Sequence, residues 1–462
     1  MKKDIKGTTR VCGLIGNPVH HTLSPAIHNT LNEIKNIDMV YVPFEVQDAD
    51  VEAAIKGALA LDILGLNVTV PHKSAVIPYL NEIDEVAGRI GAVNTLVRTE
   101  DKRGFKGYNT DYLGILRSLK EKNVNLNDER VIILGAGGAA RPAAFLAVKE
   151  GASDIYILNR TYEKALKLCE EVNSFAGKEI AKALAISDYK KVPGDRKCIC
   201  FQMTRVGLYP EVSCAPIEDE DFYKLIKIGF DAVYKPFKTK FIRLCENAGA
   251  LCISGLKMLL YQGIEAYELW NNVSVSDAEC KVIYGRLLRE LLQNKNIVLT
   301  GFMGSGKSSV AKCICKLLDY EFIDTDELIV KKQKKSINDI FAEQGEAAFR
   351  DMETDYLNNL CKSKKHGIVL SVGGGLPIRE ENRENMKKIG TVFFLSASPE
   401  TVYKRVKYDN SRPLLKSDNV LQKIKELQDE RRDIYNMACD LEIATDEFSV
   451  EQVANTIVEA ML

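Results

Sequence analysis

The chain has 462 residues, of which 46% are apolar and 27% are charged, which is ordinary soluble usage in a chain long enough for about three domains. Its 63 basic and 64 acidic side chains leave a formal net charge of −1, and residues 294–462 alone hold 25 basic and 27 acidic side chains. Neither part is a polycation, so the composition excludes bulk attraction to nucleic acid or to an anionic membrane. Phosphate or carboxylate must be bound by a few well-placed groups.

The amino-terminal residues and the cysteines both favour a cytoplasmic protein. Residues 1–4 do not lead into the apolar core of a signal peptide, and no apolar stretch approaches the ~20 residues that a bilayer requires. The 12 cysteines are scattered, and the close pairs Cys198/Cys200 and Cys313/Cys315 are poorly spaced for clamping a metal. We therefore interpret the cysteines as buried reduced thiols, with a metal site or a disulfide as the alternative. The sequence leaves the oligomeric state open.

Short β-like runs alternate with helical periodicity along the chain, which is typical of an α/β fold with mostly parallel sheets. A first series of strands begins at residues 11–15, a second at 131–134 and a third at 297–299. The junction near 293–295 has no Gly/Ser or Pro tract, so we expect a short tether there. These series predict three domains, over residues 1–110 (completed by helical segments within 255–293), 111–254 and 294–462.

Polar side chains gather at the predicted strand ends of the first domain. They are Thr22-Leu23-Ser24-Pro25 with His28-Asn29, then Asn67-Val68-Thr69-Val70-Pro71-His72-Lys73, then Ala92-Val93-Asn94-Thr95 and Asn109-Thr110-Asp111. Hydroxyls, amides, one lysine and one aspartate suit a polyhydroxylated ligand. Each residue taken alone is also an ordinary turn or cap residue, so only the combination predicts a binding pocket.

A glycine-rich turn stands near the start of the second domain. Gly135-Ala136-Gly137-Gly138-Ala139-Ala140 follows the strand at 131–134 and begins a helix, which predicts close approach of a dinucleotide pyrophosphate. The next strand ends in Asn159-Arg160-Thr161, where NAD-binding folds usually place an acid for the ribose diol. Arg160 there favours the 2′-phosphate of NADP, with a surface charge at a helix start as the alternative. Arg141, on the first turn of the glycine-loop helix, is a second candidate for holding phosphate.

Together these residues resemble shikimate dehydrogenase over roughly residues 8–290. Later motifs agree, at Asp231-Ala232-Val233-Tyr234-Lys235-Pro236 and at Gly255-Leu256-Lys257-Met258-Leu259 with Gln262. The resemblance implies a substrate domain followed by a Rossmann-type NADP domain, with Lys73 and Asp111 as the catalytic pair and Gly255 beside the nicotinamide. It further implies substrate contacts from Thr22, Ser24, Asn67, Thr69, Lys73, Asn94, Asp111, Tyr234 and Gln262. A lysine ammonium beside a ketone oxygen can donate a proton or stabilise the developing alkoxide, and an adjacent carboxylate can orient it.

Two positions depart from the pattern of this family. The family usually has serine where this chain has Thr22, and the extra methyl group narrows the pocket near the substrate carboxylate. That change favours weaker shikimate binding or a shift toward quinate-like relatives. Gln202-Met203-Thr204 stands where an Asn-x-Thr turn is common beside the cofactor, so the geometry of that turn is not predicted.

The third domain begins with a phosphate loop. Gly301-Phe302-Met303-Gly304-Ser305-Gly306-Lys307-Ser308 lies between the strand at 297–300 and a helical run at 309–318. Backbone amides of such a loop cradle phosphates, Lys307 can reach the β- and γ-phosphates, and the Ser308 hydroxyl can hold Mg²⁺. Asp324-Thr325-Asp326 closes the next strand, where one carboxylate could organise Mg²⁺ and the other take an acceptor proton. The alternative for Asp326 is a helix cap.

The remaining motifs of this domain resemble shikimate kinase along its full length. They are Phe349-Arg350 with Glu353, Gly373-Gly374-Gly375, Arg412-Pro413-Leu414-Leu415, and Glu430-Arg431 with Tyr435 and Ala438. The resemblance implies a P-loop kinase domain with a parallel sheet, in which Lys307 and Asp326 are catalytic. Shikimate would be bound by Asp326, Arg350, Gly373, Gly374, Gly375 and Arg431. ATP would be bound by Gly304, Ser305, Gly306, Lys307, Ser308, Ser309, Arg405 and the lid residue Arg412, with Mg²⁺ on Ser308 and Asp324.

The two resemblances support each other, because the product of the first reaction is the substrate of the second. We therefore expect a bifunctional enzyme of aromatic amino acid biosynthesis that uses NADP(H), ATP and Mg²⁺. It would reduce 3-dehydroshikimate and then phosphorylate shikimate, with small molecules as its partners. The alternatives are a dehydrogenase half that acts on quinate or an amino analogue, and an inactive sensor or regulator built from these domains. A sensor of that kind should have lost Lys73, Asp111, Lys307 or Asp326, and all four are present.

Overall fold

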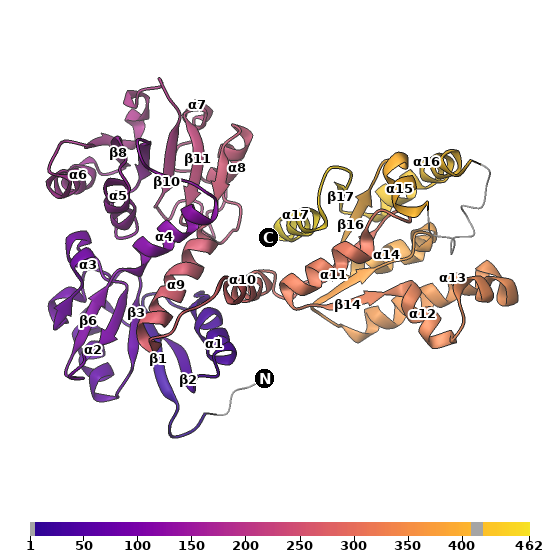
Figure 1. The fold of residues 1–462 in the computed structure, drawn as a ribbon, viewed down its shortest axis with the longest axis horizontal. Helices are drawn as coiled ribbons and strands as arrows, with labels where there is room; N and C mark the ends of the chain where they lie inside the picture. The colour runs from indigo at the N-terminus through magenta and orange to yellow at the C-terminus, as the bar shows by residue number, and fades with distance from the viewer. Residues whose placement is uncertain (1–4, 408–418) are drawn as a thin grey trace. The chain divides into compact units, whose positions relative to one another are not determined.

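The computed structural model describes residues 5–407 and 419–462, and Arg412 lies outside the described residues. The chain forms two compact units, Met1–Leu287 and Leu288–Leu462 (Figure 1). In this described part of the chain, three sheets of mostly parallel strands, with helices between the strands, confirm the predicted α/β class. Among the described residues, no helix combines the length and apolar character needed to span a bilayer.

The first sheet of the first unit has the order β2-β1-β3-β5-β6-β4. Its β1, β2 and β3 are parallel, whereas β5 runs antiparallel to both β3 and β6. Its strands are β1 (Arg10–Gly16), β2 (Met39–Glu45), β3 (Gly65–Val68), β4 (Glu82–Ile83), β5 (Thr95–Arg98) and β6 (Phe105–Tyr108). Its helices are α1 (Ser24–Ile34), α2 (Val51–Ala60) and α3 (Glu85–Ile90). Buried side chains such as Ile55, Leu66 and Phe105 form one continuous core cluster on this sheet.

The second sheet has the order β12-β11-β10-β7-β8-β9, and all its paired strands are parallel. This is the doubly wound order, whose direction of winding reverses between β7 and β10, the position where such sheets bind ligands. Its strands are β7 (Arg130–Leu134), β8 (Asp154–Asn159), β9 (Ala181–Ala185), β10 (Cys198–Gln202), β11 (Ile226–Asp231) and β12 (Leu251–Ile253). The helices here are α4 (Thr110–Glu121), α5 (Ala140–Lys149), α6 (Tyr162–Ala176), α7 (Glu220–Lys224) and α8 (Lys240–Asn247).

Two helices follow the second sheet, α9 (Gly255–Asn271) and α10 (Asp277–Leu291). Helix α9 packs closely on α4. The helices meet at Gly114, where an added Cβ would lie only 2.8 Å from the Met258 carbonyl oxygen. At its other end, α9 reaches the first sheet, where Trp270 Nε1 donates to the Leu96 carbonyl (2.9 Å). Helix α9 therefore spans both sheets of the first unit and positions residues toward each.

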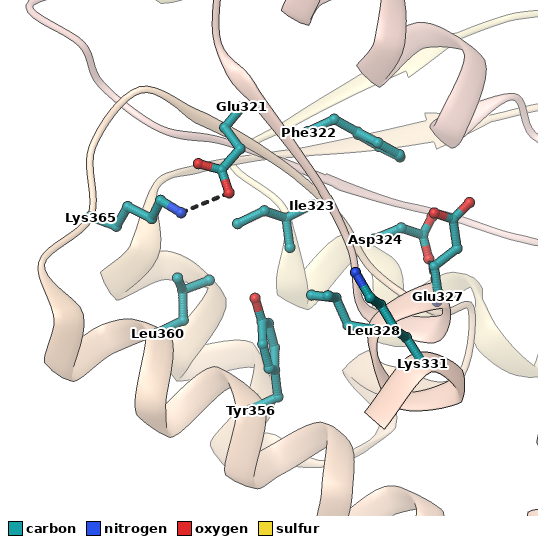
Figure 2. A pocket seen from close by; sticks show the side chains of 10 residues that line it. All are labelled: Glu321, Phe322, Ile323, Asp324, Glu327, Leu328, Lys331, Tyr356, Leu360 and Lys365. Carbon is teal, nitrogen blue, oxygen red and sulfur yellow. Dashed lines mark hydrogen bonds and ion pairs between the residues drawn. The ribbon is translucent and has the colours of Figure 1, made fainter. Parts of the chain in front are cut away.

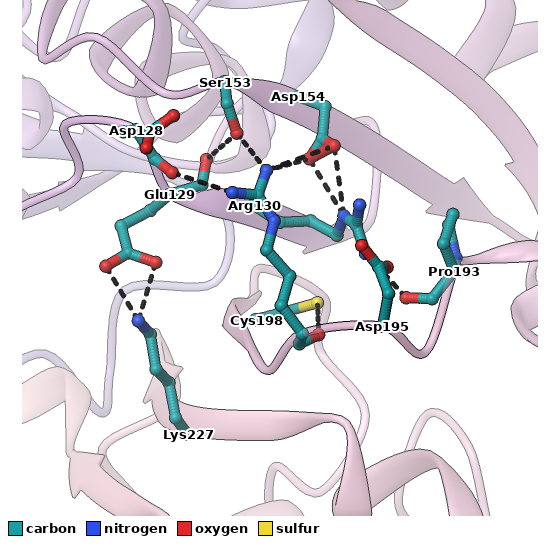
Figure 3. Close-up of polar contacts among 10 residues, drawn as sticks. Asp128, Glu129, Arg130, Ser153, Asp154, Pro193, Asp195, Cys198 and Lys227 are labelled. Carbon is teal, nitrogen blue, oxygen red and sulfur yellow. Dashed lines mark hydrogen bonds and ion pairs between the residues drawn. The ribbon is translucent and has the colours of Figure 1, made fainter.

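Charged residues fasten the amino ends of the second sheet (Figure 3). The buried guanidinium of Arg130 at the start of β7 donates to Asp154 Oδ1 (3.0 Å) and to Asp195 Oδ1 (2.5 Å). Arg196 also bonds to Asp154, and Lys227 pairs with Glu129 at 2.7 Å. These contacts join β7, β8, β10 and β11 at the end of the sheet opposite to its ligand-binding edge.

The second unit has one parallel sheet of order β14-β15-β13-β16-β17. Its strands are β13 (Ile297–Thr300), β14 (Glu321–Asp324), β15 (Ile368–Ser371), β16 (Thr391–Ser396) and β17 (Leu441–Ala444). Its helices are α11 (Lys307–Leu318), α12 (Thr325–Gln333), α13 (Ile337–Ser363), α14 (Glu380–Ile389), α15 (Pro399–Val406), α16 (Val420–Ala438) and α17 (Val450–Met461). Helix α13 is interrupted at Gly345, whose φ of +82° suits glycine.

Candidate functional site

The side chains of Lys73 and Asp111 form an ion pair in the first unit. Lys73 Nζ lies 2.5 Å from Asp111 Oδ2, and both side chains are largely buried. The backbone holds each partner: Val93 N donates to the Lys73 carbonyl (2.8 Å), and Asp111 lies on the first turn of α4, which Asn109 caps. The neighbouring His72 is buried, with Nε2 2.7 Å from the Val46 carbonyl oxygen. Two residues that are 38 positions apart thus meet with little freedom to move.

Buried amides extend from this ion pair into the substrate domain. Asn94 Oδ1 accepts from the Thr110 amide at 2.7 Å, next to Asp111, and Asn94 Nδ2 donates to Gln262 Oε1 on α9 at 3.4 Å. Asn67 Nδ2 donates to Thr95 Oγ1 (3.1 Å), and its Oδ1 accepts from the Tyr41 hydroxyl (2.7 Å). The predicted contact residues Asn67, Asn94 and Gln262 are therefore ordered by one another and by their neighbours.

The remaining predicted substrate residues occupy three separate loops. Thr22 Oγ1 donates to Ser24 Oγ at 3.1 Å, and Ser24 is the buried first residue of α1. Thr69 follows β3, and its methyl group fills the space beside Gly16. Tyr234 lies in the loop after β11. Within the described residues, no side-chain hydrogen bond joins Thr69 or Tyr234 to the Lys73–Asp111 pair.

The glycine turn after β7 borders the catalytic lysine. Gly135 has φ of +112°, which glycine adopts without strain, and its amide donates to the Leu158 carbonyl at 2.8 Å. A Cβ on Gly138 would lie 3.8 Å from Lys73 Cδ, so the turn and the lysine are neighbours. Helix α5 begins at Ala140, which leaves the amides of Ala136, Gly137 and Ala139 near a helix start, where phosphate is favoured. The turn can therefore hold a dinucleotide pyrophosphate beside Lys73.

The two candidate arginines of the dinucleotide site differ in their surroundings. Arg160 is exposed at the end of β8, next to Asn159, whose Nδ2 donates to the Thr161 carbonyl (2.8 Å). Arg141 donates to the Ile90 carbonyl and pairs with Glu171, so a phosphate would have to compete with these partners. Arg160 therefore stays the predicted ligand of a 2′-phosphate.

Gln202 and Asp231 end neighbouring strands, and their side chains had no predicted role. The Gln202 side chain accepts from the Thr204 amide (2.7 Å) and donates to the Val206 carbonyl (3.0 Å). The longer glutamine thus forms the turn itself where the family pattern has asparagine. The motifs that begin at Gln202 and at Asp231 marked these places in the sequence, but they did not indicate which contacts the two side chains make.

Glycines occupy the left-handed backbone positions of the phosphate loop in the second unit. Gly304 and Gly306 have φ of +77° and +97°, and a Cβ on Gly304 would lie 2.6 Å from Val406 Cγ1. Lys307 Nζ donates to the carbonyls of Gly301 (2.8 Å) and Phe302 (3.0 Å), and α11 begins at this lysine. Ser305 is buried and Ser309 is exposed in the same segment. Arg405 joins the loop, since its Nη1 lies 3.2 Å from the Gly304 carbonyl oxygen.

The loop ends beside an oxygen pair that suits magnesium. Ser308 Oγ donates to Asp324 Oδ2 at 3.1 Å. Hydroxyl and carboxylate oxygens are hard ligands of the kind that Mg²⁺ uses. Asp324, not Asp326, caps α12 by accepting from the amides of Asp326 and Glu327. Of the two interpretations of Asp326, the helix cap is therefore wrong, because Asp324 takes that role.

The predicted acceptor residues of the kinase half converge on the glycine turn after β15. A Cβ on Gly373 would lie 2.5 Å from Asp326 Oδ1, and one on Gly375 would lie 2.2 Å from Arg350 Nη2. The Gly374 carbonyl accepts from the Tyr435 hydroxyl at 2.7 Å, and Arg431, one turn earlier on α16, interacts with that hydroxyl. At Gly373 and Gly375 a side chain would therefore displace the aspartate or the arginine, whereas a Cβ on Gly374 would meet no atom closer than 3.5 Å.

Two glutamates hold Arg350, and one of them is fully buried. Arg350 Nη1 donates to Glu353 Oε2 and its Nη2 to Glu346 Oε1, each at 2.7 Å. Burial raises the pKa of Glu353 to about 7, while Arg350 opposes this shift and the Asp326 carboxylate adds to it. The guanidinium is therefore aimed by its own helix α13 toward Gly375.

A cavity of about 330 Å³ lies between β14, α12 and α13 (Figure 2). Apolar side chains such as Leu328 and Leu360 line it, the Tyr356 hydroxyl points into it, and Lys365 pairs with Glu321 at 2.7 Å on its side. Asp324 is the one predicted kinase residue in its lining. The cavity is thus adjacent to the proposed magnesium ligand but does not contain the acceptor residues.

Three family models match separate parts of the chain. Residues 14–96 match the model for a shikimate dehydrogenase substrate binding domain, and residues 118–192 match that for shikimate / quinate 5-dehydrogenase. Residues 303–462 match the shikimate kinase model.

Individual relatives cover the amino-terminal part. A shikimate dehydrogenase (NADP(+)) from Methanothermobacter thermautotrophicus is 42% identical over 268 residues, which are 58% of this chain and 92% of that protein. A crystal structure of a shikimate dehydrogenase in complex with NADP+ has a TM-score of 0.56 at 35% identity, over 62% of this chain and 98% of that one. The Listeria monocytogenes shikimate 5-dehydrogenase, solved with shikimate and NAD, has a TM-score of 0.56 at 32% identity, over 61% and 98%.

Proposed function

The chain belongs to the shikimate dehydrogenase family and also carries a shikimate kinase domain, which makes it a bifunctional enzyme of the shikimate pathway, and we propose the two reactions that it performs. The first half reduces 3-dehydroshikimate to shikimate with NADPH. The second half transfers the γ-phosphoryl group of ATP to the 3-hydroxyl of shikimate. We assign residues 1–110 with 255–293 to substrate binding, 111–254 to NADP(H) and 294–462 to the kinase. The 12 free cysteines support a reducing, cytoplasmic location.

The dehydrogenase assignment is carried by the Lys73–Asp111 pair beside the glycine turn. Bound NADPH would supply the hydride. Lys73, with Nζ 2.5 Å from the Asp111 carboxylate, is positioned to place a proton or a positive charge on the carbonyl oxygen as it becomes an alkoxide. Asp111 keeps the ammonium aimed, and the buried amides of Asn67, Asn94 and Gln262 orient the ring hydroxyls.

The kinase assignment is carried by the convergence of Asp326, Arg350 and the Gly373–Gly375 turn. Arg350 presents a planar fork that matches a carboxylate, so it would hold the substrate's carboxyl group while Asp326 faces its hydroxyls. Mg²⁺ held by Ser308 and Asp324 would neutralise phosphate charge. Lys307 and the loop amides would bind the transferring phosphoryl group. Arg412 stays a predicted lid residue outside the described part of the chain.

The test uses the purified full-length chain with each substrate in turn. We expect NADP⁺ reduction with shikimate, slower reduction with quinate, and ADP release when shikimate and ATP are supplied together. Absence of both activities with shikimate would overturn the proposal.

A quinate preference is the second candidate, and Thr22 is the observation that favours it. The threonine hydroxyl bonds to Ser24, which limits rotation of the side chain and so fixes the direction of the additional methyl group. A higher kcat/KM for quinate than for shikimate would select this candidate.

A further inference from the structure

Two fully buried polar side chains end neighbouring strands at the ligand-binding edge of the second sheet. Gln202 closes β10, Asp231 closes β11, and the two residues are register partners. Each holds the loop that follows its own strand. The Ala232 amide donates to the Gln202 carbonyl (2.9 Å), so the two strand ends are also joined to each other.

The carboxylate of Asp231 organises the loop at 232–238. It accepts from the Val233 amide (2.9 Å) at the loop's start and from Thr239 Oγ1 (2.5 Å) at its end. Thr239 is itself fully buried and caps α8 by accepting from the Ile242 amide at 3.2 Å. One buried carboxylate therefore ties both ends of a loop and the start of a helix.

This loop touches the residue predicted to lie beside the nicotinamide. A Cβ on Gly255 would lie 2.3 Å from the Ala232 carbonyl oxygen and 2.9 Å from that of Asp231, so the backbones are in close contact. The same loop carries Tyr234, a predicted substrate residue. A change in the loop at 232–238 would therefore displace both the start of α9 and Tyr234.

The titratable groups that face Asp231 from neighbouring elements are neutral near physiological pH. They are Cys200 on β10, Tyr223 on α7 and Cys245 on α8. Burial raises the pKa of Asp231 to about 7, while the hydrogen bonds from Thr239 and Val233 oppose the rise. Hydrogen bonds to an ionised carboxylate are stronger than those to a neutral acid. The loop is thus held more firmly above about pH 7 than below it.

We propose that Asp231 is a positioning residue of the dehydrogenase half, which fixes the loop at 232–238 against Gly255 and thereby sets the affinity for NADP(H). This inference rests on the proposed function. Asp231 would act through the loop, without touching substrate or cofactor. Its ionisation would make the affinity for NADP(H) higher at pH 8 than at pH 6.

The test compares Asp231→Asn, Asp231→Ala, Thr239→Val and Thr239→Ser in the full-length chain. The readouts are KM for NADP⁺ and kcat between pH 6 and pH 9, NADPH binding by fluorescence, and hydrogen exchange of the amides at 233–239. Asp219→Asn is the matched control, because Asp219 caps α7 from an exposed position.

We expect Asp231→Asn to flatten the dependence of KM for NADP⁺ on pH and to raise that KM several-fold at pH 8, with a smaller change in kcat. Asp231→Ala and Thr239→Val should also speed amide exchange at 233–239. Thr239→Ser keeps the hydroxyl and should therefore retain the wild-type dependence of KM on pH. Asp219→Asn should leave this dependence unchanged. Kinase activity should stay unaltered in every variant.

Two outcomes separate this inference from the proposed function. If the wild-type chain reduces NADP⁺ with shikimate but Asp231→Asn and Thr239→Val keep its KM profile and its exchange rates, the inference is overturned and the function stands. If the wild-type chain has no dehydrogenase activity, the proposed reaction fails, and NADPH binding together with exchange at 233–239 decides the role of Asp231. Unchanged binding and exchange in Asp231→Ala would then overturn it.

Discussion

The two units prepare their cationic side chains in different ways. In the first unit, Lys73 meets the carboxylate of Asp111, which belongs to the proposed reaction itself. In the second unit, Lys307 donates to two main-chain carbonyls, and Arg350 is held by Glu346 and Glu353. The dehydrogenase pocket is therefore assembled around its own catalytic pair. In the kinase half, Lys307 and Arg350 are already hydrogen-bonded to acceptors of the protein. An incoming phosphate or carboxylate must compete with these acceptors.

The largest expected effect is the loss of one activity at a time. Lys73→Ala should lower NADP⁺ reduction by about 10²–10⁴-fold, the usual contribution of a positioned acid or base, and should leave ADP release unchanged. Lys307→Ala should do the reverse, because the two sites use separate sheets. Both activities are measured on the same preparation. If either variant loses both, the two pockets are not independent.

A substitution at Arg350 tests whether the kinase half needs a guanidinium at this position. Arg350→Lys should reduce kcat/KM of the kinase for shikimate by roughly 10²-fold, because an ammonium cannot make the bidentate contact of a guanidinium. Arg379→Lys, a similar change at the partly exposed pair with Asp351, is the control. Equal activity of the two variants would show that the fork of Arg350 is not used.

The buried Glu353 predicts how the stability of the second unit depends on pH. Its folded pKa of about 7 lies above its ordinary value of 4.5, so the folded state keeps this proton to higher pH than the unfolded state. This contribution to stability is fully present below about pH 4.5 and is lost as the pH rises through 7, which amounts to on the order of 3 kcal/mol.

The free energy of unfolding of the second unit should therefore decrease less between pH 5 and pH 8 in Glu353→Gln than in the wild type. This holds even if the variant is less stable at every pH. Calorimetry of the full chain measures this, with the transition of the second unit identified by its shift when ATP is added. The prediction is wrong if the variant and the wild type lose stability in parallel over that range.

We expect a moderate change in cofactor preference when the exposed Arg160 is replaced. Arg160→Ala should weaken NADPH binding by about tenfold, the value of one charge-assisted hydrogen bond, and should leave NADH binding nearly unchanged. Fluorescence titration with both dinucleotides tests this. Arg141→Ala serves as a comparison, since its guanidinium is engaged by Ile90 and Glu171. A larger loss of NADPH affinity in Arg141→Ala would reverse the assignment of the two arginines.

The smallest effect is expected at Thr22. Thr22→Ser keeps the hydroxyl that bonds to Ser24 and removes one methyl group, so KM for shikimate should fall by at most about fourfold. The ratio of kcat/KM for shikimate and quinate should move toward shikimate. An unchanged ratio would mean that the methyl group does not face the substrate.

Local patterns predicted the fold and the loop motifs well. The apolar run at 131–134 corresponds to strand β7 (Arg130–Leu134), and the run at 297–299 corresponds to strand β13 (Ile297–Thr300). Both glycine loops lie between a strand and a helix, as expected. A strand, the glycine turn after it and the start of the next helix are each determined by consecutive residues. Short-range stereochemistry is therefore enough to find them.

Contacts between distant segments could not be predicted in the same way. Arg141 resembles a phosphate ligand in its local context, but Ile90 and Glu171, from elsewhere in the chain, occupy its guanidinium. The role of Asp231 depends on Thr239 and on complete burial, and neither is visible in an apolar run that ends with an acid. Such partners are fixed by packing of the whole unit.

The ionic network around Arg130 has a consequence for protein engineering. It joins β7, β8 and β10 at their amino ends, so part of the cohesion of the sheet is supplied away from the loops at the opposite rim. A library that varies the exposed loop positions 205, 206, 208 and 235 to change cofactor or substrate preference should yield many well-folded members, provided that the Arg130 network and the buried Gln202, Asp231 and Thr239 are left intact.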